Sequence, residues 1–176
     1  MRIQALNELI SPESIAKRVD ELARRINEDY RGKDPVVLCV LNGAFMFFAD
    51  LVRKLKVEPR VDFVRLSSYG KSDTSSGSIA FVKDAELPLA GKDVLIVEDI
   101  VDTGLTMDFL VREIRSRGVN SLRIAALVDK VERRTVDLTV DYVGFTIPSG
   151  FIVGYGLDYV GRFRELPGIY VVETEQ

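Results

Sequence analysis

The fold is decided by one stretch, Val94-Leu95-Ile96-Val97-Glu98-Asp99-Ile100-Val101-Asp102-Thr103-Gly104-Leu105-Thr106-Met107. Its first four residues are apolar, mostly β-branched and without helical spacing, which is typical of a strand buried on both faces in the middle of a parallel sheet. Three carboxylates then follow within five residues. Beyond them, apolar residues recur at helical spacing up to Gly118, and the stretch therefore predicts a strand, an acidic turn and a helix.

The turn between strand and helix predicts a phosphate site. The backbone N–H groups of residues 103–106 would lie at a helix N-terminus, beside two hydroxyls and a glycine that lets a ligand approach the main chain. Glu98 and Asp99 precede the turn where the strand leaves the sheet, and their charge is costly unless a metal ion, ligand hydroxyls or solvent meets it. This combination indicates a sugar phosphate with magnesium. The alternative is an acidic helix cap, which needs only one such group.

Length and composition favour one soluble domain. The chain has 176 residues, 47% of them hydrophobic, which suits a single domain over 1–176 with a full core. Basic and acidic residues are interspersed and the net charge is −3, so extended nucleic-acid binding has little support. No apolar run approaches membrane-spanning length, and the N-terminus lacks a signal peptide pattern. We therefore expect a cytoplasmic protein.

Histidine is absent from the chain, and Cys39 is its only cysteine. This excludes Ser–His and Cys–His catalysis and the commonest zinc sites. Carboxylates, lysine or tyrosine remain for acid–base chemistry. Cys39 lies inside the apolar run 36–41, where a small core residue is expected.

Further elements follow from pattern along the chain. Ser11 as N-cap predicts a helix up to Gly32, and Asn42-Gly43 precedes a helix whose apolar face reaches Leu55. Turns at the carboxyl ends of strands bind ligands in α/β sheets, which makes residues 41–44 a candidate second anion contact. Residues 132–134, Glu-Arg-Arg, are expected to be solvated surface. The predicted strands are 36–41, 61–66, 78–82, 122–128, 142–147 and 151–153.

Residues 67–77 form a small, polar, serine-rich loop between two predicted strands. A long loop inside a compact domain is typical of a lid or binding loop, and the alternative is a disordered tip.

Residues 94–106 resemble the signature of type I phosphoribosyltransferases, in which apolar residues precede acidic-acidic-x-x-Asp-x-x-x-Thr. The variant here is most similar to the hypoxanthine-guanine branch. Residues 151–159, Phe-x-Val-Gly-Tyr-x-Leu-Asp-Tyr, are similar to the purine-binding stretch of that branch, and the resemblance runs from about 36 to 166. It implies an α/β fold, a mostly parallel twisted sheet flanked by helices with a small hood from the chain ends. Asn42 departs from the family's pattern, where lysine is frequent in the pyrophosphate loop.

The resemblance also implies a reaction. Phosphoribosyl would pass from phosphoribosyl pyrophosphate (PRPP) to N9 of hypoxanthine or guanine, giving inosine or guanosine monophosphate (IMP or GMP) and pyrophosphate, with Mg²⁺, as in purine salvage. A homodimer or homotetramer is expected, with no nucleic-acid or membrane partner. Two alternatives stay open, a xanthine-preferring relative and a non-catalytic regulator that senses PRPP or nucleotide.

Site roles follow from the resemblance, residue by residue. Asp102 is placed near N7 of the base and, with no histidine available, is the expected general base. Ribose 5-phosphate would be bound by Glu98, Asp99, Asp102, Thr103, Gly104, Leu105 and Thr106, and pyrophosphate by Gly43, Ser68, Tyr69 and Arg164. The purine would contact Lys130, Phe151, Ile152, Leu157 and Asp158. Magnesium would be held by Glu98, Asp99 and Asp158, directly or through water.

Overall fold

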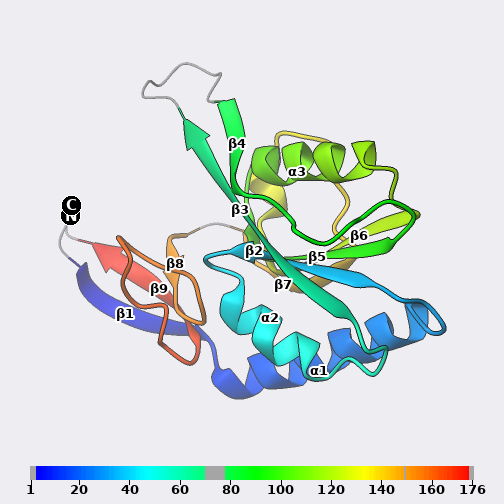
Figure 1. The fold of residues 1–176 in the computed structure, drawn as a ribbon. Helices are drawn as coiled ribbons and strands as arrows, with labels where there is room; N and C mark the ends of the chain where they lie inside the picture. The colour runs from blue at the N-terminus through cyan, green and yellow to red at the C-terminus, as the bar shows by residue number, and fades with distance from the viewer. Residues whose placement is uncertain (1–2, 70–77, 149, 175–176) are drawn as a thin grey trace.

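The structure is a computed structural model that describes residues 3–69, 78–148 and 150–174 and contains two sheets (Figure 1). The larger sheet has the order β4-β3-β2-β5-β6-β7, and its strands are parallel except for β4, which pairs antiparallel with β3. The mostly parallel sheet expected from the resemblance is therefore confirmed. Its strands are β2 (Val36–Leu41), β3 (Arg60–Tyr69), β4 (Ser78–Lys83), β5 (Asp93–Val101), β6 (Ser121–Asp129) and β7 (Tyr142–Thr146).

Helices cover both faces of this sheet (Figure 1). Helices α1 (Pro12–Asp29) and α2 (Phe45–Val52) pack on the face that carries Cys39 and Val97, whereas α3 (Leu105–Ser116) packs on the face that carries Leu38 and Ile96. Because successive strand residues point to opposite faces, central strands with two covered faces need an unbroken apolar run. This explains why β2 and β5 were recognisable from sequence.

A second, three-stranded sheet forms the hood beside the larger sheet (Figure 1). Its order is β1-β9-β8, with β1 (Ile3–Ile10), β8 (Ile152–Val153) and β9 (Ile169–Thr174) all antiparallel. The hood was expected from the resemblance, but pattern alone predicted neither β1 nor β9. Tyr155, which follows β8, attaches it to α2 by donating a 2.5 Å hydrogen bond to Asp50. In the described ranges, no helix is long and apolar enough to cross a membrane.

Several boundaries differ from those predicted. Ser11 caps α1 as expected, accepting a hydrogen bond from the Ser14 N–H at 3.2 Å, but the helix ends at Asp29 and not at Gly32. Helix α2 ends at Val52, short of Leu55. Strand β5 continues to Val101, because its last residues still pair with β6, so the acidic pair lies within the strand and not after it.

The serine-rich loop lies largely outside the described residues. Strand β3 extends through residues 67–69, and β4 begins at Ser78, as predicted, and pairs antiparallel with β3. Residues 70–77 and the side chains of Ser68 and Tyr69 are not described. The prediction of a lid there stays a prediction.

Candidate functional site

The turn from β5 into α3 has the form of an anion cradle. Gly104 is the N-cap of α3 with φ +86°, and no described side chain caps the helix, so the first N–H groups of α3 are left for a ligand or solvent. A cavity of about 120 Å³ lies at this turn. Its lining includes five of the residues predicted to bind ribose 5-phosphate: Glu98, Asp102, Thr103, Gly104 and Thr106. Leu105 differs from them, because its side chain is half exposed.

Packing as well as backbone conformation requires glycine at position 104. A Cβ there would lie 2.7 Å from Cδ of Arg134 and 2.8 Å from Cγ2 of Val136. The positive φ is also unfavourable for any residue that has a side chain. The cradle is therefore formed where the segment after β6 packs against the turn.

In the acidic pair at the end of β5, Glu98 is buried and Asp99 is partly buried. Burial, and then the charge of Asp99, raise the pKa of Glu98 well above its usual range. Burial also raises the pKa of Asp99, although hydrogen bonds and the charge of Arg164 oppose this change. Two poorly solvated carboxyl groups on adjacent residues favour sharing a proton unless a cation approaches. In the described part of the chain, no three acidic or cysteine side chains gather into a preformed metal cluster.

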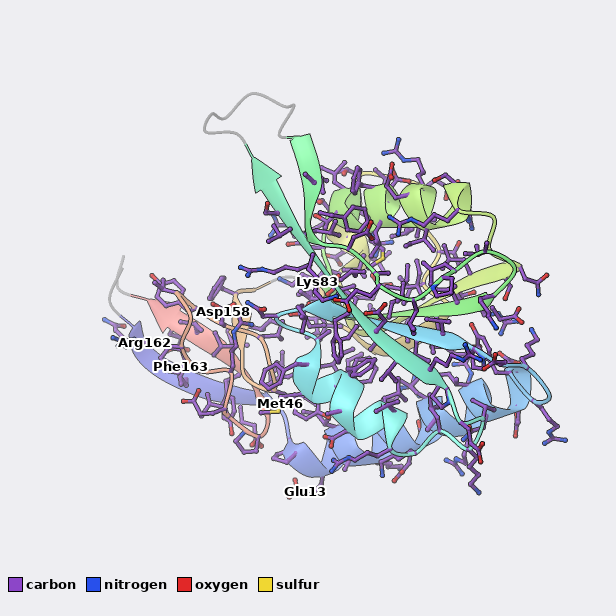
Figure 2. The ribbon with its side chains drawn as sticks, in the orientation of Figure 1. Glu13, Met46, Lys83, Asp158, Arg162 and Phe163 are labelled. Carbon is purple, nitrogen blue, oxygen red and sulfur yellow. The ribbon has the colours of Figure 1, made fainter. Side chains whose placement is uncertain are left out.

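Gly43 lies directly against this pair. A Cβ on Gly43 would be 1.5 Å from Oδ2 of Asp99, and a Cβ on Gly156 would be 2.0 Å from the Gly43 carbonyl oxygen. The loop after β2 is thus held between the end of β5 and the hood. Figure 2 labels Met46 near the start of α2 and Asp158 in the hood.

The predicted purine residues line one cavity. It has a volume of about 460 Å³ and lies between the carboxyl ends of β5 and β6 and the hood. Its walls contain Asp102, Lys130, Phe151, Ile152, Leu157 and Asp158, together with Asp99, Ile100, Arg133 and Gly150. Cavities of about 540 and 640 Å³ along α1 are larger, but none of the predicted site residues lines them.

Lys130 is buried at the base of this cavity, with 5% of its surface exposed. Its Nζ donates a 2.7 Å hydrogen bond to the Gly150 carbonyl oxygen, which uses one of three ammonium donors. Burial lowers the pKa of Lys130; the charge of Asp102 opposes this change, and that of Arg133 adds to it. The two remaining donors are available to a ligand with an acceptor.

In the hood, Arg164 and Asp158 form a partly buried pair. Nη2 of Arg164 lies 2.6 Å from Oδ1 of Asp158, and Nη1 donates to the Gly156 carbonyl oxygen at 2.5 Å. Oδ2 of Asp158 accepts from the Gly161 N–H at 2.7 Å. Figure 2 shows that Asp158, Arg162 and Phe163 all lie in this segment of the hood. Both ends of the pair are therefore already engaged without a ligand.

The expectation that residues 132–134 are solvated surface is wrong for Arg134, whose side chain is only 12% exposed. Its guanidinium forms an ion pair with the buried Asp129. It also donates to the carbonyl oxygens of Asp102 at 3.3 Å and Leu138 at 2.9 Å. Arg133 is exposed as expected, with 56% of its side chain accessible, but the sequence did not predict that its Nε lies 3.2 Å from Oδ1 of Asp102. No local pattern distinguishes these arginines from surface charges.

Replacing Arg134 by Met should destabilise the protein strongly. The change leaves the Asp129 carboxylate buried without its partner, which costs about 3 kcal/mol or more. Thermal unfolding should show the midpoint falling by roughly 6–12 °C. Arg112→Met is the matched control, because Arg112 is 70% exposed in its pair with Asp108 and should change the midpoint little. A midpoint for Arg134→Met as close to native as that of the control would mean that the ion pair with Asp129 does not stabilise the fold.

Comparison with known proteins gives a consistent result. The family model described as "Phosphoribosyl transferase domain" matches residues 7–160. The hypoxanthine-guanine phosphoribosyltransferase of Bacillus subtilis is 44% identical over 94% of this chain and 92% of its own, and that of Aquifex aeolicus is 44% identical over 98% of both. A crystal structure of a hypoxanthine-guanine phosphoribosyltransferase from Bacillus anthracis superposes with a TM-score of 0.89 at 42% identity, covering 98% of this chain and 99% of that one.

Proposed function

This chain belongs to the phosphoribosyl transferase domain family, and from that membership we propose that it transfers phosphoribosyl from PRPP to a 6-oxopurine in purine salvage. The products are IMP or GMP and pyrophosphate. The observation that carries the proposal is one cavity in which Asp102 and Lys130 face the hood, directly beside the phosphate cradle of α3. Sugar phosphate and base can thus be bound next to each other.

Phosphate binding falls to the cradle. The 5-phosphate of PRPP would accept hydrogen bonds from the N–H groups of residues 103–106 and from the hydroxyls of Thr103 and Thr106. The helix dipole and the uncapped N–H groups favour negative charge there without a basic side chain. Pyrophosphate would lie at the Gly43 backbone. Arg164 would add positive charge there, since its charge already opposes the rise that burial causes in the pKa of Asp99, which Gly43 contacts.

Base recognition and proton transfer would take place in the cavity of about 460 Å³ that Asp102 and Lys130 line. Lys130 would donate to O6 of the purine, and Asp102 would accept the proton that the base loses as its N9 bonds to the ribose. Phe151 stands at the rim with its ring centroid 5.4 Å from that of Tyr159, edge to face, so a flat ligand could stack there. Ile152 and Leu157 supply apolar walls.

Magnesium fits the acidic groups present. Glu98 is buried and Asp99 beside it is partly buried; among the described residues Arg164 is the cation whose charge acts on Asp99, and Asp158 contributes a third carboxylate across the cavity. When bound, the ion would neutralise charge that develops on the departing pyrophosphate. Since Mg²⁺ keeps most of its waters, these carboxylates need not form a cage around it.

The activity is tested directly by mixing the protein with PRPP, Mg²⁺ and hypoxanthine and measuring IMP. Guanine, xanthine and adenine in parallel give the base preference. Xanthine as the best substrate would select the xanthine-preferring alternative. No product with any base, while PRPP still binds, would favour a regulator.

Gly43→Ala should impair use of PRPP. Gly43 lacks the positive φ that would strain an alanine, so the only obstacle is the methyl group, which would overlap Asp99 Oδ2. Displacing that carboxylate by about 1 Å should lower kcat/KM for PRPP by roughly 10- to 100-fold. Gly32→Ala is the control, since Gly32 has open space around it and a φ of +75°, so it reports generic glycine effects. Equal kinetics for the two variants would argue against a role for the Gly43–Asp99 contact.

Assembly into a homodimer or homotetramer is part of the proposal. Phe45, Val61 and Phe63 on α2 and β3 expose between 36% and 43% of their surface, and the Phe63 ring packs 5.5 Å from that of Phe48. Exposed apolar side chains on neighbouring elements are typical of contacts between subunits. Light scattering of the purified protein gives the oligomeric state.

A further inference from the structure

The carboxylate of Asp102 has two oxygens in different surroundings. Oδ1 is shielded from solvent and accepts no well-oriented hydrogen bond from the described residues. The side chain as a whole is nevertheless 36% exposed, and it lines both the phosphate cradle and the cavity that contains Lys130. A carboxylate that accepts a proton from a ligand must present one oxygen in a defined direction. Something must therefore hold the shielded oxygen in place.

Arg133 is the cation placed to do so. Its Nε lies 3.2 Å from Oδ1 of Asp102, close enough for an ion pair. A one-turn 3₁₀ helix, Val131–Arg133, follows β6, and the Arg133 N–H donates to the Lys130 carbonyl oxygen at 3.1 Å. This turn brings the side chain back to the cavity wall that Lys130 also lines.

The neighbouring cations have other partners. Arg134 contacts Asp102 only at its backbone carbonyl and uses its other nitrogens on Asp129 and Leu138. Lys130 donates to Gly150. Two adjacent arginines thus hold the same aspartate at different groups, Arg134 at the main chain and Arg133 at the carboxylate.

We propose that Arg133 is a positioning residue for Asp102, which fixes the carboxylate through Oδ1 and leaves Oδ2 directed at the bound purine. This inference rests on the proposed transfer reaction. Arg133 acts through Asp102 and does not touch the substrate. Its effect must therefore appear in turnover with purine and not in the binding of PRPP, and it must vanish when Asp102 loses its charge.

The test is a double-mutant cycle between Arg133→Gln and Asp102→Asn. In the native background, R133Q should lower kcat by about twofold to fivefold with KM for PRPP unchanged, the size expected for a partly exposed pair. Arg133→Lys, which keeps the charge, should recover most of the loss. In the Asp102→Asn background, R133Q should have no further effect. Arg112→Gln, which removes an exposed cation on α3, is the control and should leave kcat unchanged.

Three outcomes would overturn the inference. An equal loss on R133Q with and without the Asp102 charge would mean that Arg133 contacts substrate directly. A rise in KM for PRPP at constant kcat would make it a phosphate ligand. No change in kcat would leave it an ordinary surface charge.

Thermal unfolding of the same four ligand-free proteins separates this inference from the transfer reaction itself. R133Q should lower the midpoint by roughly 1–3 °C only when Asp102 is charged, whatever the native protein catalyses. If the native protein makes no IMP, the proposed function fails while this coupling still decides whether Arg133 holds Asp102.

Discussion

Asp102→Asn is expected to lower kcat for IMP formation by roughly 10²- to 10⁴-fold, the usual contribution of a general base. Asparagine keeps the size of the side chain and can still bond to the purine, but it cannot accept the proton. The chain has no histidine to replace it. Since the phosphate would be bound by backbone N–H groups and threonine hydroxyls, and not by the Asp102 carboxylate, PRPP binding should change little. Steady-state kinetics with hypoxanthine, together with titration of PRPP, separates the two effects.

Asp20→Asn is the matched control for this variant. Asp20 lies on the outer surface of α1, 57% exposed and paired with Lys54, and its loss should leave turnover near the native level. If Asp102→Asn also keeps native turnover, Asp102 has no part in proton transfer. If instead PRPP affinity falls in parallel with kcat, Asp102 belongs to the phosphate site.

Lys130→Ala is expected to abolish efficient use of hypoxanthine. An ammonium donates and cannot accept, so it matches the O6 carbonyl of a 6-oxopurine and not the 6-amino group of adenine. The native protein should therefore disfavour adenine by about 10³-fold or more in kcat/KM. The structure supports this choice, because Lys130 is buried in the cavity wall and, among the residues that the structure describes, the Gly150 carbonyl alone accepts a hydrogen bond from its ammonium. The variant should lose most of that discrimination, chiefly through lower kcat/KM for hypoxanthine.

Measurement of kcat/KM for hypoxanthine and adenine with both proteins decides this prediction. Lys17→Ala removes an exposed lysine from α1 and serves as the control for charge alone. Native-like selectivity of the Lys130 variant would show that another group recognises the substituent at position 6 of the purine. Because Lys130 also holds Gly150, a thermal unfolding scan should accompany the kinetics to show that the variant is folded.

The central strand, turn and helix could be predicted because all their determinants are local. The apolar run of β5, the glycine at 104 and the spacing of the α3 face are properties of consecutive residues. Such local patterns predict a buried strand, a turn and a helix in any α/β sheet. The carboxyl edge of the sheet then brings Asp102 and Lys130 together without further information, since parallel strands end on one side. Pattern did not predict β1 or β9 of the hood sheet: β1 mixes polar with apolar residues, and β9, the central strand of that sheet, carries only a short apolar run near the end of the chain.

The sequence by itself determined which segments supply the candidate site and in what order they follow along the chain: the acidic pair, the phosphate cradle, the lysine and the purine segment. Only the tertiary structure decided which charges are buried. Arg133 and Arg134 look alike in sequence, yet one lines the cavity and the other is enclosed between β6 and the cradle. Gly43 and Asp99 are far apart in sequence and touch in space. The burial of a side chain depends on which other segments pack around it, and the periodicity of its own segment does not predict those contacts.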